Sequence, residues 1–425
     1  MMDKPQELPR TVGFWGTALF PVNGMIGAGI FAMPAILVAA VGNFAPWMML
    51  AGAVLIAPLA FVFAMLAMRF DSHGGPVLYA HAAFGPFVGF QSGWMRYASA
   101  VVAVAANTQV AIAYIAVLFP VLDDPTLRAA AVIAFMAFIT IINLVGTRAS
   151  VRALGAMTLV KLLPLVALIV IGLATRDPAV GISLPEFSEF ESVVLLTFYA
   201  YMAFENANFP AGELRNPRRT IPLALLTTIA AVALFYMLVI WAYLAIAPQA
   251  GDGESALAAA AEAVSGQAGA IVISIAAAFS IGANILNGGI VVPRMTYGMG
   301  EKGMLPRMFA HVSPRFQTPD VSILFYGGVA VAFSLWAGFA ALAVASTLSR
   351  LVMYLLSALA LPVLQKRDAD NAPWWHLPLS MLAVLATLWV ASHASGEAYR
   401  MLGLIFLVGT ALYFIAARQQ APDRG

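Results

Sequence analysis

The sequence predicts an all-α membrane protein with twelve transmembrane helices, and its composition is the first observation behind this prediction. Of the 425 residues, 62% are hydrophobic and only 10% are charged, and the mean hydropathy is +0.89. A soluble domain carries about 25% charged residues. The chain is therefore expected to fold in a lipid bilayer, as a single transmembrane domain over residues 1–425.

The second observation is the length of the apolar segments, since a spanning helix needs about 20 predominantly apolar residues. Segments of this kind alternate with short polar stretches rich in proline, glycine and aspartate. The predicted spans are 14–40, 46–69, 86–120, 127–145, 154–175, 192–212, 220–247, 267–299, 321–338, 340–364, 374–394 and 399–417.

The third observation is the position of the basic residues, which gather on the cytoplasmic side of membrane proteins. With a cytoplasmic N-terminus, sixteen lysines and arginines fall on the inner side, and only Arg128, Arg176 and Arg400 fall on the outer side. A miscounted span would mix the two sets. Both termini are therefore expected in the cytoplasm.

Several classes of protein are disfavoured by the composition. The absence of cysteine excludes disulfides and cysteine-ligated metals, and a net charge of +2 gives no reason to expect a nucleic-acid partner. The five histidines fall in or near predicted loops, without an HExxH pattern, and no pore-loop filter is visible. An enzyme or a channel is not expected, nor is a metal or cofactor.

Two of the predicted spans look interrupted. The first contains "PVNGMIGAGIFAMP" at residues 21–34, and the sixth contains "FENANFPAG" at 204–212. Glycine lowers helix stability by roughly 1 kcal/mol relative to alanine, and open backbone at membrane depth is tolerated only where it is buried or lines a cavity. Two interrupted helices five positions apart are typical of transporters with a 5+5 inverted repeat, whose substrate binds near the bilayer centre.

A break near Ala28 would expose backbone N–H groups at the start of the second half-helix. Such groups bind anions, so a substrate carboxylate is expected on the backbone of Gly27, Ala28, Gly29 and Ile30. The alternative is that the glycines only permit close helix packing.

The matching break in the sixth span would free the carbonyl groups of Ala203 and Phe204. Carbonyl groups at the C-terminal end of a half-helix bind cations. A substrate ammonium is therefore expected there, and this arrangement needs no carboxylate side chain.

Four stretches in order carry a resemblance to a known family. They are "IGAGIFAMP" at 26–34, "GGPVLYAHAAFGPFVGFQSGW" at 74–94, "AFENANFPAGELRNPRRTIPLA" at 203–224 and "PRMTYGMGEKGMLPRMFAHVSPRFQTP" at 293–319. Together they resemble the amino acid–polyamine–organocation (APC) transporter superfamily, over about residues 12–367. The resemblance implies two inverted five-helix repeats within this core, with spans 374–394 and 399–417 as peripheral helices.

The resemblance also suggests roles in the sixth helix. Tyr199 falls where the family often places an aromatic gate over the substrate, and Phe204 could form the pocket wall; ordinary packing is the alternative for both. Glu205 falls at the family's acidic position. Three interpretations of it stay open, in this order: it bridges the unwound segments, it exchanges a proton during transport, or it binds a cationic substrate.

Lys161 in the fifth span, within "TLVKLLPL", points to the coupling ion. Sodium-coupled relatives of the fold hold sodium between helices 1 and 8, near helix 5, and some sodium-independent members place a lysine amine there. Lys161 matches that lysine, and snorkelling to the cytoplasmic face is the alternative. Ser280, Asn284 and Asn287 share one face of the eighth helix. They are expected to line the transport pathway near Lys161, or alternatively to form hydrogen bonds that hold helices together.

The remaining polar groups within the spans are weaker candidates. Asn107 and Gln109 resemble the eighth-helix residues, and Arg96 and Arg350 are expected to satisfy helix ends or neighbouring carbonyl groups. Glu205 is the only carboxylate predicted at membrane depth. This favours a zwitterionic substrate over a polycation.

These expectations together describe a sodium-independent secondary transporter that works by alternating access. We expect it to carry neutral amino acids by proton-coupled symport or exchange, as a multi-pass protein of the cell (inner) membrane. The alternatives are a polyamine or cationic amino acid exchanger, an exporter of the same fold, or a sensor that does not transport. The specific amino acid and the oligomeric state are left open.

Overall fold

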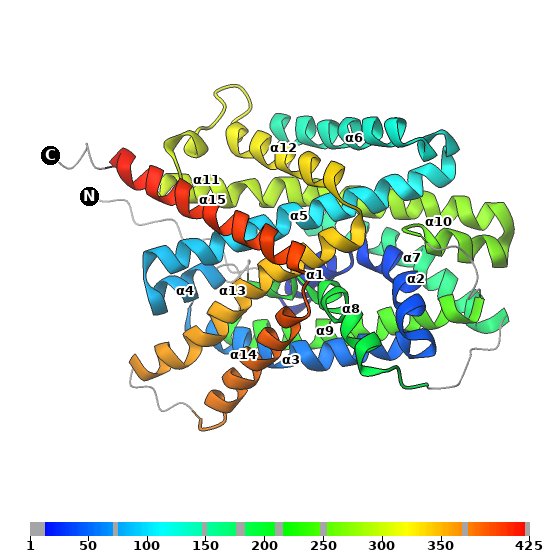
Figure 1. Ribbon diagram of the computed structural model, residues 1–425, viewed down its shortest axis with the longest axis horizontal. Coiled ribbons are helices and arrows are strands. Elements are labelled where there is room, and N and C mark those ends of the chain that lie inside the picture. Colours follow the sequence, from blue (N-terminus) through cyan, green and yellow to red (C-terminus); the bar gives the residue numbers. More distant parts are fainter. Residues whose placement is uncertain are drawn as a thin grey trace.

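The computed structural model describes residues 13–70, 75–146, 151–175, 183–208, 216–246, 253–367 and 373–420, and within these ranges all regular structure is helical (Figure 1). The helices are α1 Phe14–Met25, α2 Gly29–Val41, α3 Ala45–Arg69, α4 Pro76–Phe84, α5 Pro86–Leu118, α6 Pro125–Val145, α7 Val151–Thr175, α8 Phe187–Tyr201, α9 Pro217–Ile246, α10 Ala256–Val291, α11 Pro293–Glu301, α12 Asp320–Trp336, α13 Phe339–Arg367, α14 His376–Ser392 and α15 Gly396–Gln420. Four short 3-10 helices complete the described structure: η1 Gly42–Phe44, η2 Pro120–Asp123, η3 Phe204–Asn208 and η5 Arg307–Ala310.

The predicted spans correspond to these helices. Every one contains a helix of the structure, and the first and sixth are divided, into α1 and α2 and into α8 and η3. Within the described residues, seven helical stretches are long and apolar enough to cross a membrane, and three further apolar helices are shorter. The all-helical membrane class is thereby confirmed, whereas the count of twelve spans and the inverted repeat stay predictions.

Two helices differ from the predicted boundaries for local reasons. Helix α10 begins at Ala256, before the predicted span at 267, because Gly266 (φ 65°) joins two helical pieces at a kink. Helix α4 precedes the third span, between Gly75 (φ 47°) and Gly85 (φ 91°). Both flanking residues have positive φ, which glycine adopts without steric penalty.

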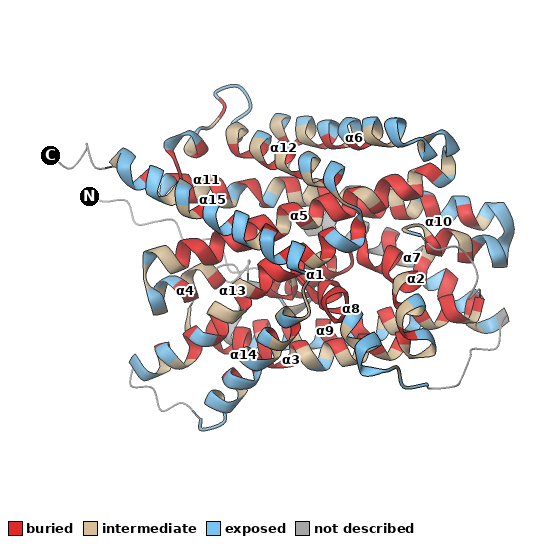
Figure 2. Ribbon diagram, in the orientation of Figure 1, coloured by how far each residue is buried: buried red, intermediate tan, exposed pale blue. Residues whose placement is uncertain are grey.

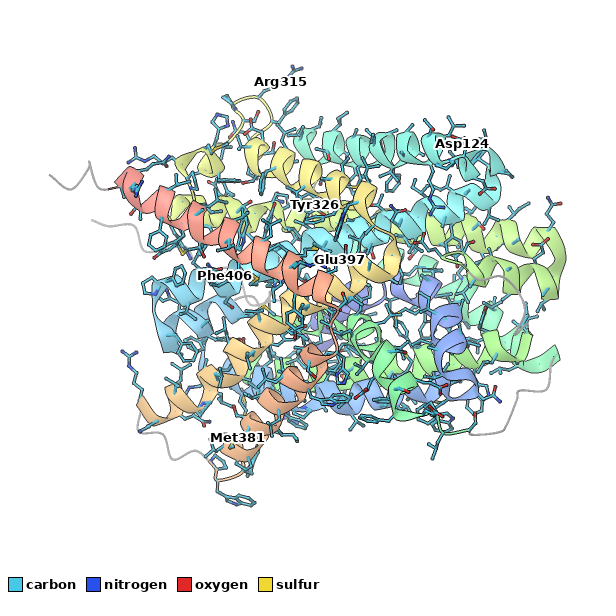
Figure 3. All side chains as sticks on the ribbon, in the orientation of Figure 1. Asp124, Arg315, Tyr326, Met381, Glu397 and Phe406 are labelled. Carbon is cyan, nitrogen blue, oxygen red and sulfur yellow. The ribbon has the colours of Figure 1, made fainter. Side chains whose placement is uncertain are left out.

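The core of the molecule is built around α5. This helix packs against α4, α10, α12 and α13, while α3 runs along α9. Buried residues concentrate on these central helices, whereas α6 at the edge of the view and α15 across its front are largely exposed (Figure 2). Many of the exposed side chains on these two helices and on α14 are apolar, among them Met381 of α14 and Phe406 of α15 (Figure 3). Such a surface is suited to contact with lipid.

The two interrupted helices pack against each other. Helix α1 contacts η3 and α9, and α2 contacts α8. The approach is close at Gly24, where an added Cβ atom would lie 2.7 Å from Ala203 Cβ and 2.7 Å from Asn206 Nδ2. The two breaks therefore face one another in the middle of the molecule.

Candidate functional site

The start of α2 presents backbone N–H groups at the first break. In its first turn, the N–H groups of Phe31 and Ala32 donate to the carbonyl of Ala28, at 3.0 and 3.2 Å. The N–H groups of Gly29 and Ile30 have no acceptor within the helix, because the first turn of a helix offers none. These groups and the helix dipole favour a negatively charged ligand at this point.

On the other side of the break, the carbonyl groups at the end of α1 are bound by side chains from three further helices. Asn284 of α10 donates to the carbonyl of Asn23 at 2.9 Å, Tyr236 of α9 to that of Met25 at 2.8 Å, and Lys161 of α7 to that of Ile26 at 2.9 Å. An unsatisfied backbone group at membrane depth costs several kcal/mol. These three side chains therefore hold the opened backbone in place.

Lys161 makes a second contact at the same place. Its Nζ atom donates to Asn23 Oδ1 at 2.9 Å, and the residue is only 3% exposed. The amine is therefore turned into the protein, towards the end of α1, and not to the surface.

A hydrogen-bonded chain connects this region with Tyr199 of α8. Asn284 Oδ1 accepts a hydrogen bond from Asn107 Nδ2 at 3.2 Å, and Asn107 Oδ1 accepts one from the Tyr199 hydroxyl at 3.0 Å. The Tyr199 ring packs edge-on against Phe339, with the ring centroids 5.7 Å apart. Through Asn23, which binds both Lys161 and Asn284, the amine is linked to the predicted aromatic gate.

The second break follows α8 and is centred on Ala203, whose φ of 76° is unusual for a residue with a side chain. The carbonyl of Ala203 accepts a hydrogen bond from the N–H of Asn206 at 3.0 Å. Phe204 is fully buried and packs against the rings of Phe63 and Tyr354. Asn206 and Glu205, which follow Ala203 in this turn, both contact Arg96.

Glu205 is enclosed by two arginines and a tyrosine. Its Oε1 atom lies 2.9 Å from Arg350 Nη1 and 3.7 Å from Arg96 Nε, and its Oε2 atom accepts a hydrogen bond from the Tyr354 hydroxyl at 2.9 Å. The Glu205 side chain is 1% exposed. Arg96 also donates to Asn206 Oδ1 at 3.2 Å, and Arg350 to Ser99 Oγ at 3.0 Å. The cluster ties η3 to α5 and α13.

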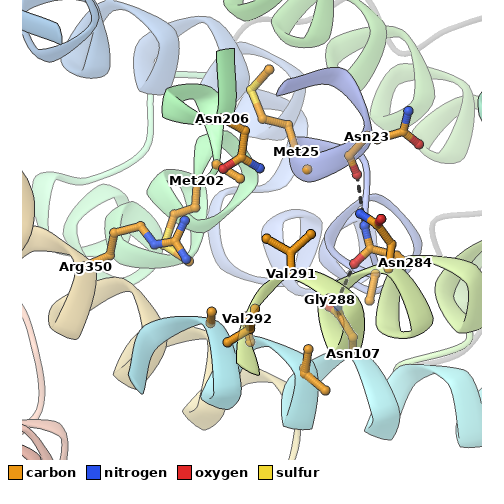
Figure 4. A pocket seen from close by; sticks show the side chains of 18 of the residues that line it. Asn23, Met25, Asn107, Met202, Asn206, Asn284, Gly288, Val291, Val292 and Arg350 are labelled. Carbon is orange, nitrogen blue, oxygen red and sulfur yellow. Dashed lines mark hydrogen bonds between the residues drawn. The ribbon is translucent and has the colours of Figure 1, made fainter. Parts of the chain in front are cut away.

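A cavity of ≈ 380 Å³ lies between the two breaks (Figure 4). Figure 4 shows Arg350 on one side of it and Asn23, Asn107 and Asn284 on the other. Of the candidates named from the sequence, those that line it are Gly27, Ala28, Gly29, Asn107, Tyr199, Ala203, Asn284 and Asn287. Those outside its lining are Ile30, Gln109, Lys161, Phe204, Glu205 and Ser280.

The sequence did not single out Arg96, Arg350, Asn23 or Asn206 as ligand-binding candidates, yet all four line the cavity. For the two arginines the sequence did carry a signal, because a charged residue within a transmembrane span usually faces the protein interior or a water-filled cavity.

Within the described residues, no group of three or more histidine, aspartate or glutamate side chains is placed to hold a metal ion.

An apolar helical bundle with two facing helix breaks, and between them a cavity whose lining includes asparagine and arginine side chains, defines a multi-pass membrane transporter. The chain matches the amino acid permease family over residues 12–416 and belongs to that family, within the APC superfamily. It is 26% identical to the serine/threonine exchanger SteT of Bacillus subtilis, over 97% of each chain. It is 29% identical to an uncharacterized transporter of Mycobacterium tuberculosis, over all of this chain and 96% of the relative.

The contact between the two breaks leads to a prediction for Gly24→Ala. The new Cβ atom would meet Ala203 Cβ, which cannot rotate away, so we expect the free energy of unfolding to fall by about 1–3 kcal/mol. Thermal unfolding in detergent measures this loss. Gly328→Ala in α12 is the matched control, because no atom lies within 4 Å of its added Cβ. Equal stability of the two variants would contradict the close packing of the breaks.

Proposed function

We propose that the protein is a sodium-independent secondary transporter that exchanges amino acids through the cavity between the two helix breaks. The observation that carries this proposal is the pairing of a helix N-terminus at Gly29 with the Lys161 amine at the end of the preceding half-helix. Membership of the amino acid permease family supports amino acid transport in general. The residues in and around the cavity support the proposals on substrate recognition and ion coupling.

Recognition of the substrate is assigned to the backbone. The N–H groups of Gly29 and Ile30 suit the α-carboxylate, while Gly27 and Ala28 leave room for its approach because they carry little or no side chain. The ammonium is expected near the carbonyl of Ala203, which retains a second lone pair beside its bond to Asn206. Tyr199 lines the same cavity and would close it on one side.

Sodium independence is supported by the position of Lys161. Its amine binds Ile26 O and Asn23 Oδ1, two oxygen atoms of the kind that coordinate alkali cations. A protonated amine at this position supplies the positive charge itself and excludes a second cation by repulsion. Release of its proton would weaken both hydrogen bonds, because a neutral amine is a weaker donor than an ammonium group, and this connects proton transfer with movement of this half-helix.

Exchange is favoured over other modes by the similarity to a serine/threonine exchanger. A polyamine or another cation is disfavoured, because the carboxylate of Glu205 already binds Arg350, Arg96 and Tyr354. Of the three roles considered for Glu205, bridging of the two unwound segments is not what these contacts describe: among the described residues they join η3 to α5 and α13. A neutral side chain remains the prediction from the sequence.

Counterflow into proteoliposomes tests this function. Purified protein is loaded with one unlabelled amino acid and supplied with a trace of the same labelled compound, for a panel of amino acids and polyamines in sodium-free buffer. We expect saturable accumulation of at least one amino acid and of no polyamine. Accumulation of polyamines alone would overturn the assignment of the cavity.

A further inference from the structure

We propose that His393 and Glu191 form a pH-sensitive tie between α14 and α8, which holds α8 in its present position while His393 is protonated. Helix α8 is the half-helix that carries Tyr199, and Tyr199 lines the cavity. The tie therefore acts on the wall of the cavity from outside it. The inference goes beyond the proposed function, because it concerns the conformation that is populated at a given pH and not the compound that is carried.

The first argument is the chemistry of the two contacts of His393. Its Nε2 atom lies 2.7 Å from Glu191 Oε1, and its Nδ1 atom lies 2.7 Å from the carbonyl oxygen of Trp389. A carboxylate and a carbonyl group only accept hydrogen bonds, and only the protonated imidazole carries a hydrogen on each nitrogen. Loss of one proton therefore removes one of the two bonds, together with the charge that attracts Glu191.

The second argument is the surroundings of the pair. The carbonyl of Trp389 belongs to the last turn of α14, and the C-terminal end of a helix favours a positive charge. The side chains of His393 and Glu191 are 16% and 29% exposed. A partly buried pair is screened less by salt than an exposed one, and the remaining exposure lets protons exchange with water. Histidine is the side chain whose unperturbed charge change falls between about pH 5 and 8.

The neighbours of His393 on α8, α14 and α15 leave Glu191 as its charged partner among the described residues. The nearest side chain on α14 is the uncharged Ser392, whose Oγ lies 3.4 Å from His393 Nδ1. On α15, the Tyr399 hydroxyl donates to the carbonyl of Ala391 at 2.7 Å. The other charged residues at the start of α8 and of α15 are all exposed, and they are Glu186, Glu189, Glu397 and Arg400.

The charged residues of α3 and α13, which also pack against α14, face other partners. They are Arg69, Arg350, Lys366 and Arg367. Arg350 binds Glu205, and the other three lie where α3 and α13 end, because Arg69 donates to the carbonyl of Leu364. Helix α14 begins beside this point, where His376 contacts Gln365, and His393 follows its other end. A change of charge at His393 is therefore felt by α8.

The third argument is what the tie holds. The first turn of α8 also packs against α14, with the Phe187 and Phe190 rings 6.4 and 6.3 Å from the Trp389 ring. Tyr199 lies about two turns beyond Glu191 on the same helix. The second break separates α8 from the chain that follows. The position of its first turn against α14 therefore governs the position of Tyr199.

The test measures the position of α8 directly. The chain has no cysteine, so spin labels can be attached through Ser188→Cys in α8 and Leu127→Cys in α6, both at exposed positions. Helix α6 contacts α5, α10 and α12, and it serves as the reference. Distances between the labels are recorded by pulsed electron paramagnetic resonance on the full-length protein in liposomes. We expect a second distance whose fraction is at least about three-fold larger at about pH 8 than at about pH 6.

Single substitutions connect this change with the tie. His393→Gln and Glu191→Gln each replace one member of the pair with an uncharged amide, and both are expected to abolish the pH dependence of the distance. His311→Gln is the matched control, because His311 also forms an ion pair, with Asp320 at 2.7 Å. Asp320 begins α12, away from the pair on α8 and α14, so this variant should keep the full change.

Each outcome decides the proposal. A second distance that depends on pH, is lost in His393→Gln and Glu191→Gln and is kept in His311→Gln supports the tie. A distance distribution that is the same at both pH values overturns it. A pH dependence that persists in either amide variant, or that is also lost in His311→Gln, overturns it as well. The labels report on α8 without any substrate, so this result is independent of the test of the proposed function.

Discussion

Lys161→Met is expected to abolish exchange, with a fall in initial rate of at least about 100-fold. The amine donates to Ile26 O and to Asn23 Oδ1, and methionine keeps the length of the side chain but donates nothing. Hydrogen bonds to charged groups contribute about 1.5–3 kcal/mol, and the oxygen atoms left behind lie where water is scarce. Of the three side chains described above at the end of α1, Asn284 and Tyr236 would then remain.

Counterflow of the best substrate, normalised to the amount of folded protein, measures this effect. Lys302→Met is the matched control, because Lys302 is exposed at the end of α11 and should be replaceable without loss. Exchange by Lys161→Met at the rate of the unmodified protein would show that the amine has no part in transport.

Glu205→Ala is expected to destabilise the protein by about 3–5 kcal/mol, the typical effect of removing one partner of a buried ion pair. The substitution leaves the guanidinium groups of Arg350 and Arg96 beside each other without their shared carboxylate. Tyr354 loses its acceptor at the same time. Thermal unfolding and the monodisperse fraction in size-exclusion chromatography measure the effect.

A double variant separates charge from packing. Glu205→Ala with Arg350→Met restores a net charge of +1 and is expected to regain about half of the lost stability, which a double-mutant cycle quantifies. Glu397→Ala on the exposed first turn of α15 controls for loss of a carboxylate and should change stability by less than about 0.5 kcal/mol. A single Glu205→Ala effect below about 1 kcal/mol would contradict the role assigned to the cluster.

The interruption of the first helix could be predicted from the sequence because its cause is local. Gly24, Gly27 and Gly29 fall within six residues, and the structure ends α1 at Met25 and begins α2 at Gly29. The kink in α10 also has a local cause, in Gly266. This kink was not predicted, because the mean hydropathy of a segment carries no information about the backbone dihedral angles of a single residue.

The partners of Glu205 could not be predicted, because they depend on the packing of helices far apart in the chain. Arg350 is 145 residues from Glu205, and Asn206 is 110 residues from its partner Arg96. The sequence indicated that each buried charge needs a partner, but only the contacts of η3 with α5 and α13 identify which charges meet. The hydrogen bond between Lys161 and Asn23 could not be predicted for the same reason, because the two residues are 138 positions apart in the chain.

The measurement that tests the central claim most directly is the sodium dependence of exchange. Initial rates of counterflow would be recorded with sodium raised from a nominally free buffer to about 100 mM, with choline as the replacing cation and ionic strength held constant. If the Lys161 amine takes the place of a coupling cation, the rate and the KM of the substrate stay unchanged throughout. A rate that rises with sodium and saturates would show that the oxygen atoms of Asn23 and Ile26 bind an ion during transport, and would contradict this account.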